Sequence, residues 1–260
     1  MPARDEAELI AAAHENFVGS YRKLVEHCAG SEVREAGSVF TFVSGLPLSL
    51  FNGCIVTGPA EADEVAAALA WLAGHDLPFR AWVAPEVVSG LLHVFAARGL
   101  ELEPEPYPGM VLNPVPAAPA PAGGVEVARI DAAGLDEFVQ VSIDGGLPAD
   151  LARRLTPPSF AADPAVQLFV GRLDGRAVGT SIAIQSRNAS GIVAVATLPE
   201  ARRRGVGAAV SWAAVSAGAE HGHDTTVLQS SPMGFPVYAA MGFRTVVPYA
   251  ALSRASATIR

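Results

Sequence analysis

The order of apolar and polar positions divides the first half of the chain into alternating helical and strand-like segments. Residues 5–29 place Leu9, Ala13 and Phe17 on one side at helical spacing, which predicts an amphipathic helix. Short runs rich in β-branched and aromatic residues follow and are typical of strands. The expected strands are 39–43, 54–57, 80–84 and an extended piece over 100–112, and the expected helices are 63–73, capped by Asp63, and 87–98. This alternation predicts an α/β fold.

Residues 113–124 interrupt the pattern with a stretch rich in proline and alanine. Proline donates no backbone hydrogen bond, so such a stretch sustains neither a helix nor a sheet and is typical of an extended linker. The sequence therefore predicts one domain over residues 1–113, a linker over 114–123 and a second domain over 124–260.

The second half follows a similar pattern. A strand is expected over 125–130, helices over 135–142 and 149–155, and a hairpin of 166–172 with 177–185 that Asp174-Gly175 closes. A further buried strand is expected from Ile192 to Thr197, and Pro199 prevents it from continuing. An alanine-rich helix then begins near Gly205.

The loop between that strand and that helix has the chemistry of a phosphate site. A helix start leaves backbone N–H groups unpaired and carries partial positive charge, which attracts anions. Gly205 and Gly207 allow a ligand close to the backbone, and three consecutive arginines add positive charge. A Walker A loop needs a Lys-Ser/Thr pair after its second glycine, and this pair is missing after Gly207, which disfavours a nucleotide triphosphatase. A dinucleotide fingerprint needs a small residue where Val210 stands, so that class of site also fits poorly.

Two motifs resemble the GNAT (GCN5-related N-acetyltransferase) family. Arg202-x-x-Gly205-x-Gly207 is similar to the pyrophosphate loop of that family. A second stretch, which begins at Val227 about twenty-five residues after Arg202, carries Tyr238, and three residues separate this tyrosine from a Gly-Phe pair, as in the last motif of the family. The resemblance covers roughly residues 124–255.

The resemblance implies acetyl-CoA as cofactor and a set of residues that hold it. The loop would bind the pyrophosphate, and the strand before it would give backbone groups to the pantetheine arm and the thioester. Tyr238 would be the general acid that protonates the departing thiolate. Ser231 stands where many relatives carry an asparagine that contacts the cofactor. The expected cofactor-binding residues are Val195, Ala196, Thr197, Arg202, Arg203, Arg204, Gly205, Val206, Gly207, Ala208 and Ser231.

An internal similarity extends the resemblance to the first half. Residues 94–100 align with residues 237–243, which predicts two GNAT-like acyl-CoA N-acyltransferase folds in tandem, each with a mixed, mostly antiparallel sheet flanked by helices. The first copy has Phe95 in place of the tyrosine, and an acidic stretch over 60–65 where the phosphate loop would be. We therefore expect a degenerate N-terminal half.

The general base and the acceptor are the parts of the expected reaction that the sequence defines least. Many relatives carry a glutamate in the strand before the loop, but residues 191–197 include none, and Glu200 is expected to be a surface carboxylate. Asp144 lies in a Gly-rich segment where the family often binds the acceptor, and water could serve as base. The expected reaction is acetyl transfer to a primary amine of a small molecule or peptide by direct attack on the thioester. The alternative is a CoA- or acyl-CoA-binding sensor or interaction protein without turnover, and a longer acyl donor stays open.

Composition and charge limit the kinds of partner and the location that we expect for the protein. A formal charge of −8 over 260 residues disfavours nucleic acid. Cys28 and Cys54 follow no metal-binding spacing, so no metal is expected and a reduced state is favoured. The N-terminus has no signal-peptide core and no run of eighteen apolar residues occurs, which predicts a soluble, cytoplasmic protein without a membrane partner. The chain is expected to be a monomer with an internal pseudo-dimer, or a homodimer.

Overall fold

The computed structural model describes residues 4–121 and 124–254, and these form two compact units. Unit 1 comprises the described parts of Met1–His27 and Gly109–Val246, and unit 2 those of Cys28–Pro108 and Val247–Arg260. Each unit therefore combines two separate stretches of sequence, whereas each predicted domain is one continuous stretch. The assignment of two GNAT-like domains in tandem stays a prediction.

The sheet of unit 1 is mixed and mostly antiparallel, which confirms the predicted fold class. Strands β7, β8, β9 and β10 pair in antiparallel fashion in that order, β10 pairs with β11 in parallel, and β11 pairs antiparallel with β6. The strands are β6 (Tyr107–Leu112, in unit 1 from Gly109 on), β7 (Val125–Ile130), β8 (Val166–Leu173), β9 (Arg176–Gln185), β10 (Ser190–Thr197) and β11 (Thr226–Gln229).

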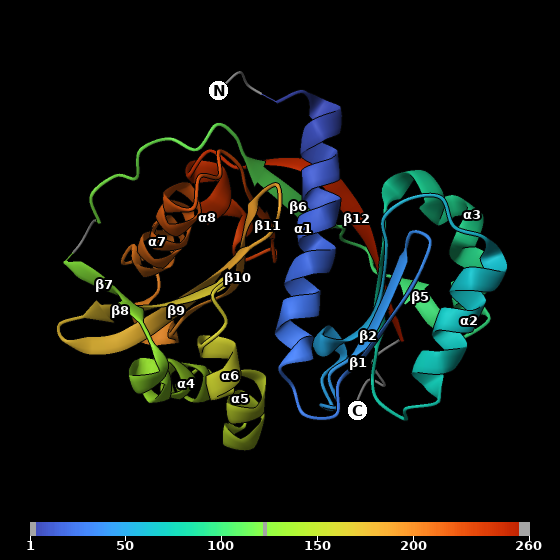
Figure 1. The fold of residues 1–260 in the computed structure, drawn as a ribbon, viewed down its shortest axis with the longest axis horizontal. Helices are drawn as coiled ribbons and strands as arrows, with labels where there is room; N and C mark the ends of the chain where they lie inside the picture. The colour runs from blue at the N-terminus through green and yellow to red at the C-terminus, as the bar shows by residue number, and fades with distance from the viewer. Residues whose placement is uncertain (1–3, 122–123, 255–260) are drawn as a thin grey trace. The chain divides into compact units, whose positions relative to one another are not determined.

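Helices cover both faces of this sheet, as Figure 1 shows, with α7 on one face and α4, α5 and α6 on the other. Gly171 and Gly179 let α7 lie close to the sheet, because a Cβ at Gly179 would come within 2.4 Å of a methyl of Val206, the first residue of α7. The helices are α4 (Leu135–Asp144), α5 (Ala149–Leu155), α6 (Pro158–Ala161), α7 (Val206–Glu220) and α8 (Phe235–Ala240).

Helix α1 (Glu6–Glu26) also belongs to unit 1, although more than eighty residues separate it from the rest of that unit. Asp5 and Glu8 form a capping box at its start. The helix packs on β10 and β11, and a Cβ at Gly191 of β10 would come within 2.6 Å of side-chain oxygens of Asn16 and Ser20. Glycine at this position therefore allows α1 to approach the sheet.

Unit 2 has its own sheet, in the order β1, β2, β3, β4, β12 and β5, with β3–β4 as its parallel pair. Helices α2 and α3 pack on it around a core that includes Leu69, Phe95 and Leu252. The elements are β1 (Glu32–Ala36), β2 (Val39–Val43), a 3₁₀ turn (Ser49–Phe51), β3 (Asn52–Val56), α2 (Ala62–Ala73), β4 (Arg80–Val83), α3 (Pro85–Ala96), β5 (Leu100–Leu102) and β12 (Arg244–Arg254, in unit 2 from Val247 on).

The local predictions hold with two corrections. Gly99 and Gly242 end their helices with φ of +72° and +97°, and the Asp174-Gly175 turn has positive φ at both residues. Asp63 was expected to cap its helix, but it lies in the first turn of α2, and the cap is Glu61, paired reciprocally with Glu64. Strand β1 was not predicted, because all five of its residues are exposed and show no apolar alternation.

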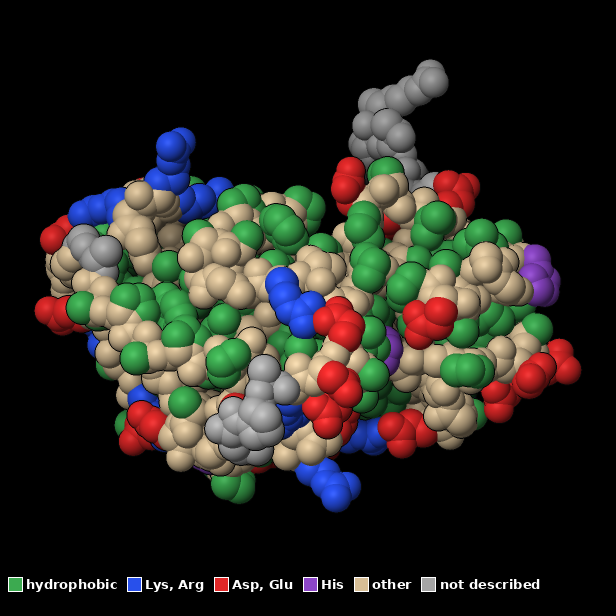
Figure 2. Space-filling model, turned by 90° about the horizontal axis from the view of Figure 1, so that it is seen from above, with side chains coloured by type: hydrophobic (Ala, Val, Ile, Leu, Met, Phe, Trp, Pro, Cys, Tyr) green, Lys and Arg blue, Asp and Glu red, His purple; other side chains and the backbone are tan. Residues whose placement is uncertain are grey.

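The surface carries charges of both signs among apolar side chains on the face that Figure 2 presents. Among the residues that the structure describes, Met233 is the most exposed large apolar side chain, at 68%. It lies in the turn before α8, two residues before Phe235, the first residue of that helix. Among the described residues, no helix combines the length and the apolar character that crossing a membrane requires.

Candidate functional site

The site begins where β10 and β11 part. The two strands pair in parallel only from Ser190 to Ile192 of β10, opposite Thr226 to Leu228 of β11. Beyond that point β10 continues to Thr197, whereas β11 ends at Gln229. The second half of β10 therefore has no partner in β11.

A bulge in β10 accompanies this divergence. The register with β9 shifts between Val193 and Ala196, and Ala194 has φ of +52°, a left-handed conformation that is uncommon for residues other than glycine. The hydroxyl of Thr180 donates to the carbonyl of Ala194 at 3.3 Å. The bulge changes the direction of the strand at the point where the open edge begins.

The loop after β10 leads into α7 without a side-chain cap. Gly205, the N-cap, has φ of +83°, and no side chain hydrogen-bonds to the first turn of the helix. A Cβ at Gly207 would lie 3.4 Å from Oγ1 of Thr197, so the helix start lies against the end of β10. The N–H groups of the first turn are thus available to an anion, with the helix dipole in the attractive direction.

A cavity of about 540 Å³ connects the open strand edge to this helix start. The predicted cofactor residues that line it come from β10, from the loop, from the start of α7 and, in the case of Ser231, from the turn before α8. The lining residues are Gly145, Val195, Ala196, Thr197, Leu198, Pro199, Arg202, Arg203, Gly205, Val206, Gly207, Ala208, Ser231, Met233, Gly234, Val237 and Tyr238.

The three arginines of the loop differ in their surroundings. Arg202 and Arg203 line the cavity, and Nε of Arg202 donates to the carbonyl of Thr197 at 3.4 Å. Arg204 is not among the lining residues. Its guanidinium lies 3.5 Å from the carboxylate of Asp174, at the tip of the β8–β9 hairpin. The structure thus brings ten of the eleven predicted cofactor residues to the cavity and turns Arg204 toward the hairpin.

Tyr238 lies in the wall of the cavity on α8 and is 7% exposed. Its ring packs edge-on against Phe243, with centroids 5.9 Å apart. A Cβ at Gly234 would be 2.8 Å from this ring, so glycine there leaves room for the tyrosine. Ser231 also lines the cavity, and its hydroxyl accepts a hydrogen bond from the N–H of Gly234 at 3.2 Å. Serine here stabilises the turn that leads into α8.

The two carboxylates considered from the sequence lie outside this wall. Asp144 is exposed at the end of α4, where it accepts a hydrogen bond from Gln140 at 2.7 Å. Its neighbour Gly145 does line the cavity. Glu200 is half-exposed and pairs with Arg176 at 3.0 Å. None of the described residues that line the cavity is an aspartate, glutamate or histidine.

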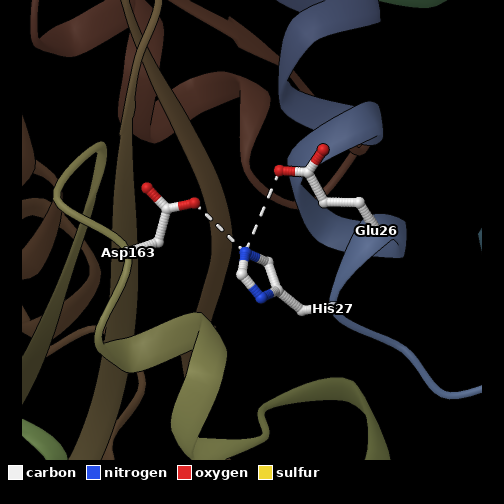
Figure 3. Close-up of side chains that lie close together, drawn as sticks. All are labelled: Glu26, His27 and Asp163. Carbon is white, nitrogen blue, oxygen red and sulfur yellow. Dashed lines mark hydrogen bonds and ion pairs between the residues drawn. The ribbon is translucent and has the colours of Figure 1, made fainter.

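A separate ionic cluster joins the end of α1 to the turn before β8. Glu26, His27 and Asp163 point toward one another in Figure 3, with His27 Nε2 3.1 Å from Asp163. Three such ligand atoms could hold a metal ion, but Lys23 Nζ already lies 2.8 Å from Asp163 and 2.6 Å from Glu26. This ammonium offsets part of the charge of the two carboxylates, and the ion pairs join the end of α1 to the turn before β8.

Sequence reasoning missed the apolar part of the cavity. Leu198 and Pro199 follow β10, and Met233 and Val237 lie in and before α8. These residue types carry no chemical signal of their own. Their proximity to the two motifs in the sequence was the only available indication.

Comparisons with known proteins agree with this geometry. The model of the "Acetyltransferase (GNAT) domain" family matches residues 148–251. A GCN5-related N-acetyltransferase from Kribbella flavida has a TM-score of 0.67 at 20% identity, over 96% of this chain and 97% of that one. A search of curated proteins finds no match.

Two further solved structures share the fold along nearly their whole length. A GCN5-related N-acetyltransferase from Sphaerobacter thermophilus has a TM-score of 0.60 at 13% identity, over 96% of this chain and 93% of that one. A tandem GNAT protein from the clavulanic acid biosynthesis pathway has a TM-score of 0.57 at 14% identity, over 96% of both chains. The motifs on β10, α7 and α8 lie within the family match, so the GNAT acetyltransferase domain that the sequence predicts is confirmed for residues 148–251.

Proposed function

We propose that this protein transfers an acetyl group from acetyl-CoA to a primary amine of a small molecule or peptide. The observation that carries the proposal is the cavity that joins the open edge of β10 to the uncapped start of α7, with Tyr238 in its wall. An elongated thioester with a pyrophosphate needs such a combination, because one part must be held by strand hydrogen bonds and the other by an anion site.

The residues present fit this co-substrate. The N–H groups at the start of α7, with Arg202 and Arg203, would bind the pyrophosphate. The backbone of Val195 to Thr197 would hydrogen-bond the pantetheine arm, because this stretch has no β11 partner. When bound, acetyl-CoA supplies an activated acyl group that an amine can attack directly.

The chain itself would then position the groups and move a proton. Holding the thioester in the cavity replaces a bimolecular encounter by a fixed geometry, and backbone N–H groups of β10 would stabilise a developing oxyanion. The phenol of Tyr238 would donate its proton to the departing thiolate. Asp144, one residue from the lining residue Gly145, remains the candidate for contact with the acceptor.

The alternative, a CoA- or acyl-CoA-binding sensor without turnover, is favoured by one observation. No carboxylate or imidazole belongs to the described lining residues, so a general base must be water or a group on the acceptor side. A release assay for free thiol over a panel of amines separates the two functions, since only the enzyme consumes acetyl-CoA.

Calorimetric titration with acetyl-CoA and CoA tests the shared part of both functions. We expect Arg203→Gln to lower the affinity for CoA about tenfold or more, because a charged hydrogen bond contributes roughly 1.5–3 kcal/mol in such sites. Arg204→Gln is the matched control and should weaken CoA less, because Arg204 faces Asp174 and not the cavity.

Absence of binding by the unaltered protein would contradict both functions. Equal losses in the two variants would indicate that the loop acts only through its overall charge.

A further inference from the structure

A second cavity, of about 350 Å³, lies between the Pro/Ala linker and α7. It is lined by four linker residues, by Val127 of β7 and by one side of α7. Figure 1 shows the linker passing α7 on its way from β6 to β7. The lining residues are Ala118, Pro119, Ala120, Pro121, Val127, Gly205, Ala208, Ala209, Trp212, Ala213 and Ser216.

This cavity adjoins the phosphate loop. Gly205 and Ala208 line both it and the larger cavity, so the two meet at the start of α7. In CoA the pyrophosphate joins the pantetheine arm on one side to the adenosine on the other. A pyrophosphate at the start of α7, with its pantetheine along β10, would therefore direct the adenosine away from β10.

The lining of the second cavity suits a flat aromatic base. No charged residue belongs to its described lining, and the large side chain among small alanines is the indole of Trp212, which is partly exposed. An indole stacks well on the face of a purine, and proline rings offer apolar contact beside it.

The linker is attached to unit 1 where it leaves β6. The side-chain amide of Asn113 donates to the carbonyl of Asp224 at 3.0 Å and to Thr225 Oγ1 at 2.8 Å. The N–H of Val115 donates to the same Asp224 carbonyl at 3.0 Å. Prolines further restrict the following backbone. The start of the linker is therefore held against unit 1, and its described residues 118–121 form one wall of the cavity beside α7.

We infer that the Pro/Ala linker and Trp212 form a binding site for the adenine ring of CoA, so that the linker between the predicted domains is part of the co-substrate site. The inference rests on the proposed function, because the pyrophosphate position determines where the adenosine goes.

The test compares two ligands on the unaltered protein, CoA and 4′-phosphopantetheine, which lacks the adenosine together with its 3′-phosphate and one phosphate of the pyrophosphate. We expect CoA to bind at least tenfold more tightly. The variant Trp212→Leu should reduce this difference several-fold and keep its affinity for 4′-phosphopantetheine, whereas Trp212→Phe should retain most of the difference. Because 4′-phosphopantetheine has no adenosine to contact Trp212, an unchanged affinity for it shows that a variant still folds.

The outcomes separate the inference from the function. If neither ligand binds, the proposed function fails. If both bind equally well to the unaltered protein, or if Trp212→Leu preserves the full difference, the adenine site is wrong and the proposed function stands. Should Trp212→Leu not fold, the double variant Pro119→Gly, Pro121→Gly replaces it. A flexible linker should also lower the affinity for CoA more than the affinity for 4′-phosphopantetheine.

Discussion

At the scale of single residues, the site depends on small side chains that leave room for larger ones. Gly234 leaves space for the ring of Tyr238, and Gly207 allows the start of α7 to lie against Thr197. Where the predicted first copy has Phe95, the side chain is fully buried in the core of unit 2. Tyr238 is also buried in a core, that of unit 1, but unlike Phe95 it lines the cavity beside β10.

The phenol of Tyr238 gives the first prediction. We expect Tyr238→Phe to lower kcat about 10²-fold or more, because positioned proton transfer contributes rate factors of that size. Calorimetric affinity for CoA should stay the same, since the ring packing against Phe243 is kept. Steady-state kinetics across pH check this. An unchanged kcat at every pH would remove Tyr238 from the role of general acid.

At the scale of elements, the position of α7 depends on β8 and β9. Gly171 and Gly179 form an adjacent pair in the two strands, and α7 lies over both. The distance from the sheet to α7 determines where the uncapped helix start meets the end of β10. The proposed phosphate site therefore depends on the packing of three elements and not on the loop alone.

Substitution of Gly179 tests this packing. Gly179→Ala should lower the free energy of unfolding by about 1–3 kcal/mol, the usual cost of overpacking, because its Cβ would come within 2.4 Å of Val206. CoA affinity should fall with it, and Val206→Ala should restore part of both. Denaturant unfolding and calorimetry measure the two effects.

Gly19→Ala in α1 is the matched control. Its Cβ would have no neighbour nearer than 4.0 Å, so helix propensity should make this change neutral or stabilising. Equal destabilisation by both substitutions would contradict the packing argument.

At the scale of the molecule, residues far apart in sequence hold unit 1 together. Lys23 and Asp163 are 140 residues apart and form an ion pair that attaches the end of α1 near β8. Burial favours a higher pKa for Asp163, but hydrogen bonds from Lys23, the N–H of Ala165 and His27 lower the pKa below its ordinary value. Hydrogen bonds from Lys23 to Asp163 and Glu26 raise the pKa of Lys23.

These shifts predict how stability depends on pH. The Asp163 pKa is lower in the folded protein, so its contribution is present above the ordinary value of 3.8 and is lost as the pH falls below it. Asp163→Asn should lower the free energy of unfolding by about 1–3 kcal/mol at neutral pH, and by less as the pH falls below about 4.

Denaturant unfolding at several pH values checks the Asp163 prediction. The Lys23 contribution should persist up to alkaline pH, because its pKa is raised. A difference between the unaltered protein and Asp163→Asn that does not shrink in acid would contradict the role of the ionised carboxylate.

The sequence by itself determined the elements and the chemistry of the loop. Helical and strand periodicity, the glycines with positive φ and the spacing of the two motifs are local properties, and local sterics and hydrogen bonding decide them. For this reason β10, α7 and α8, with Gly205, Gly207 and Tyr238, could be identified from residues alone.

Tertiary structure decided which parts of the chain belong together. Only packing assigns α1 to unit 1 and the end of β12 to unit 2, because such contacts join residues that no local pattern connects. Packing likewise turns Arg204 toward Asp174, pairs Glu200 with Arg176 and brings the Pro/Ala linker to Trp212. Charge runs and linkers have the same sequence whether they face solvent or a ligand, so their role follows from their neighbours in space.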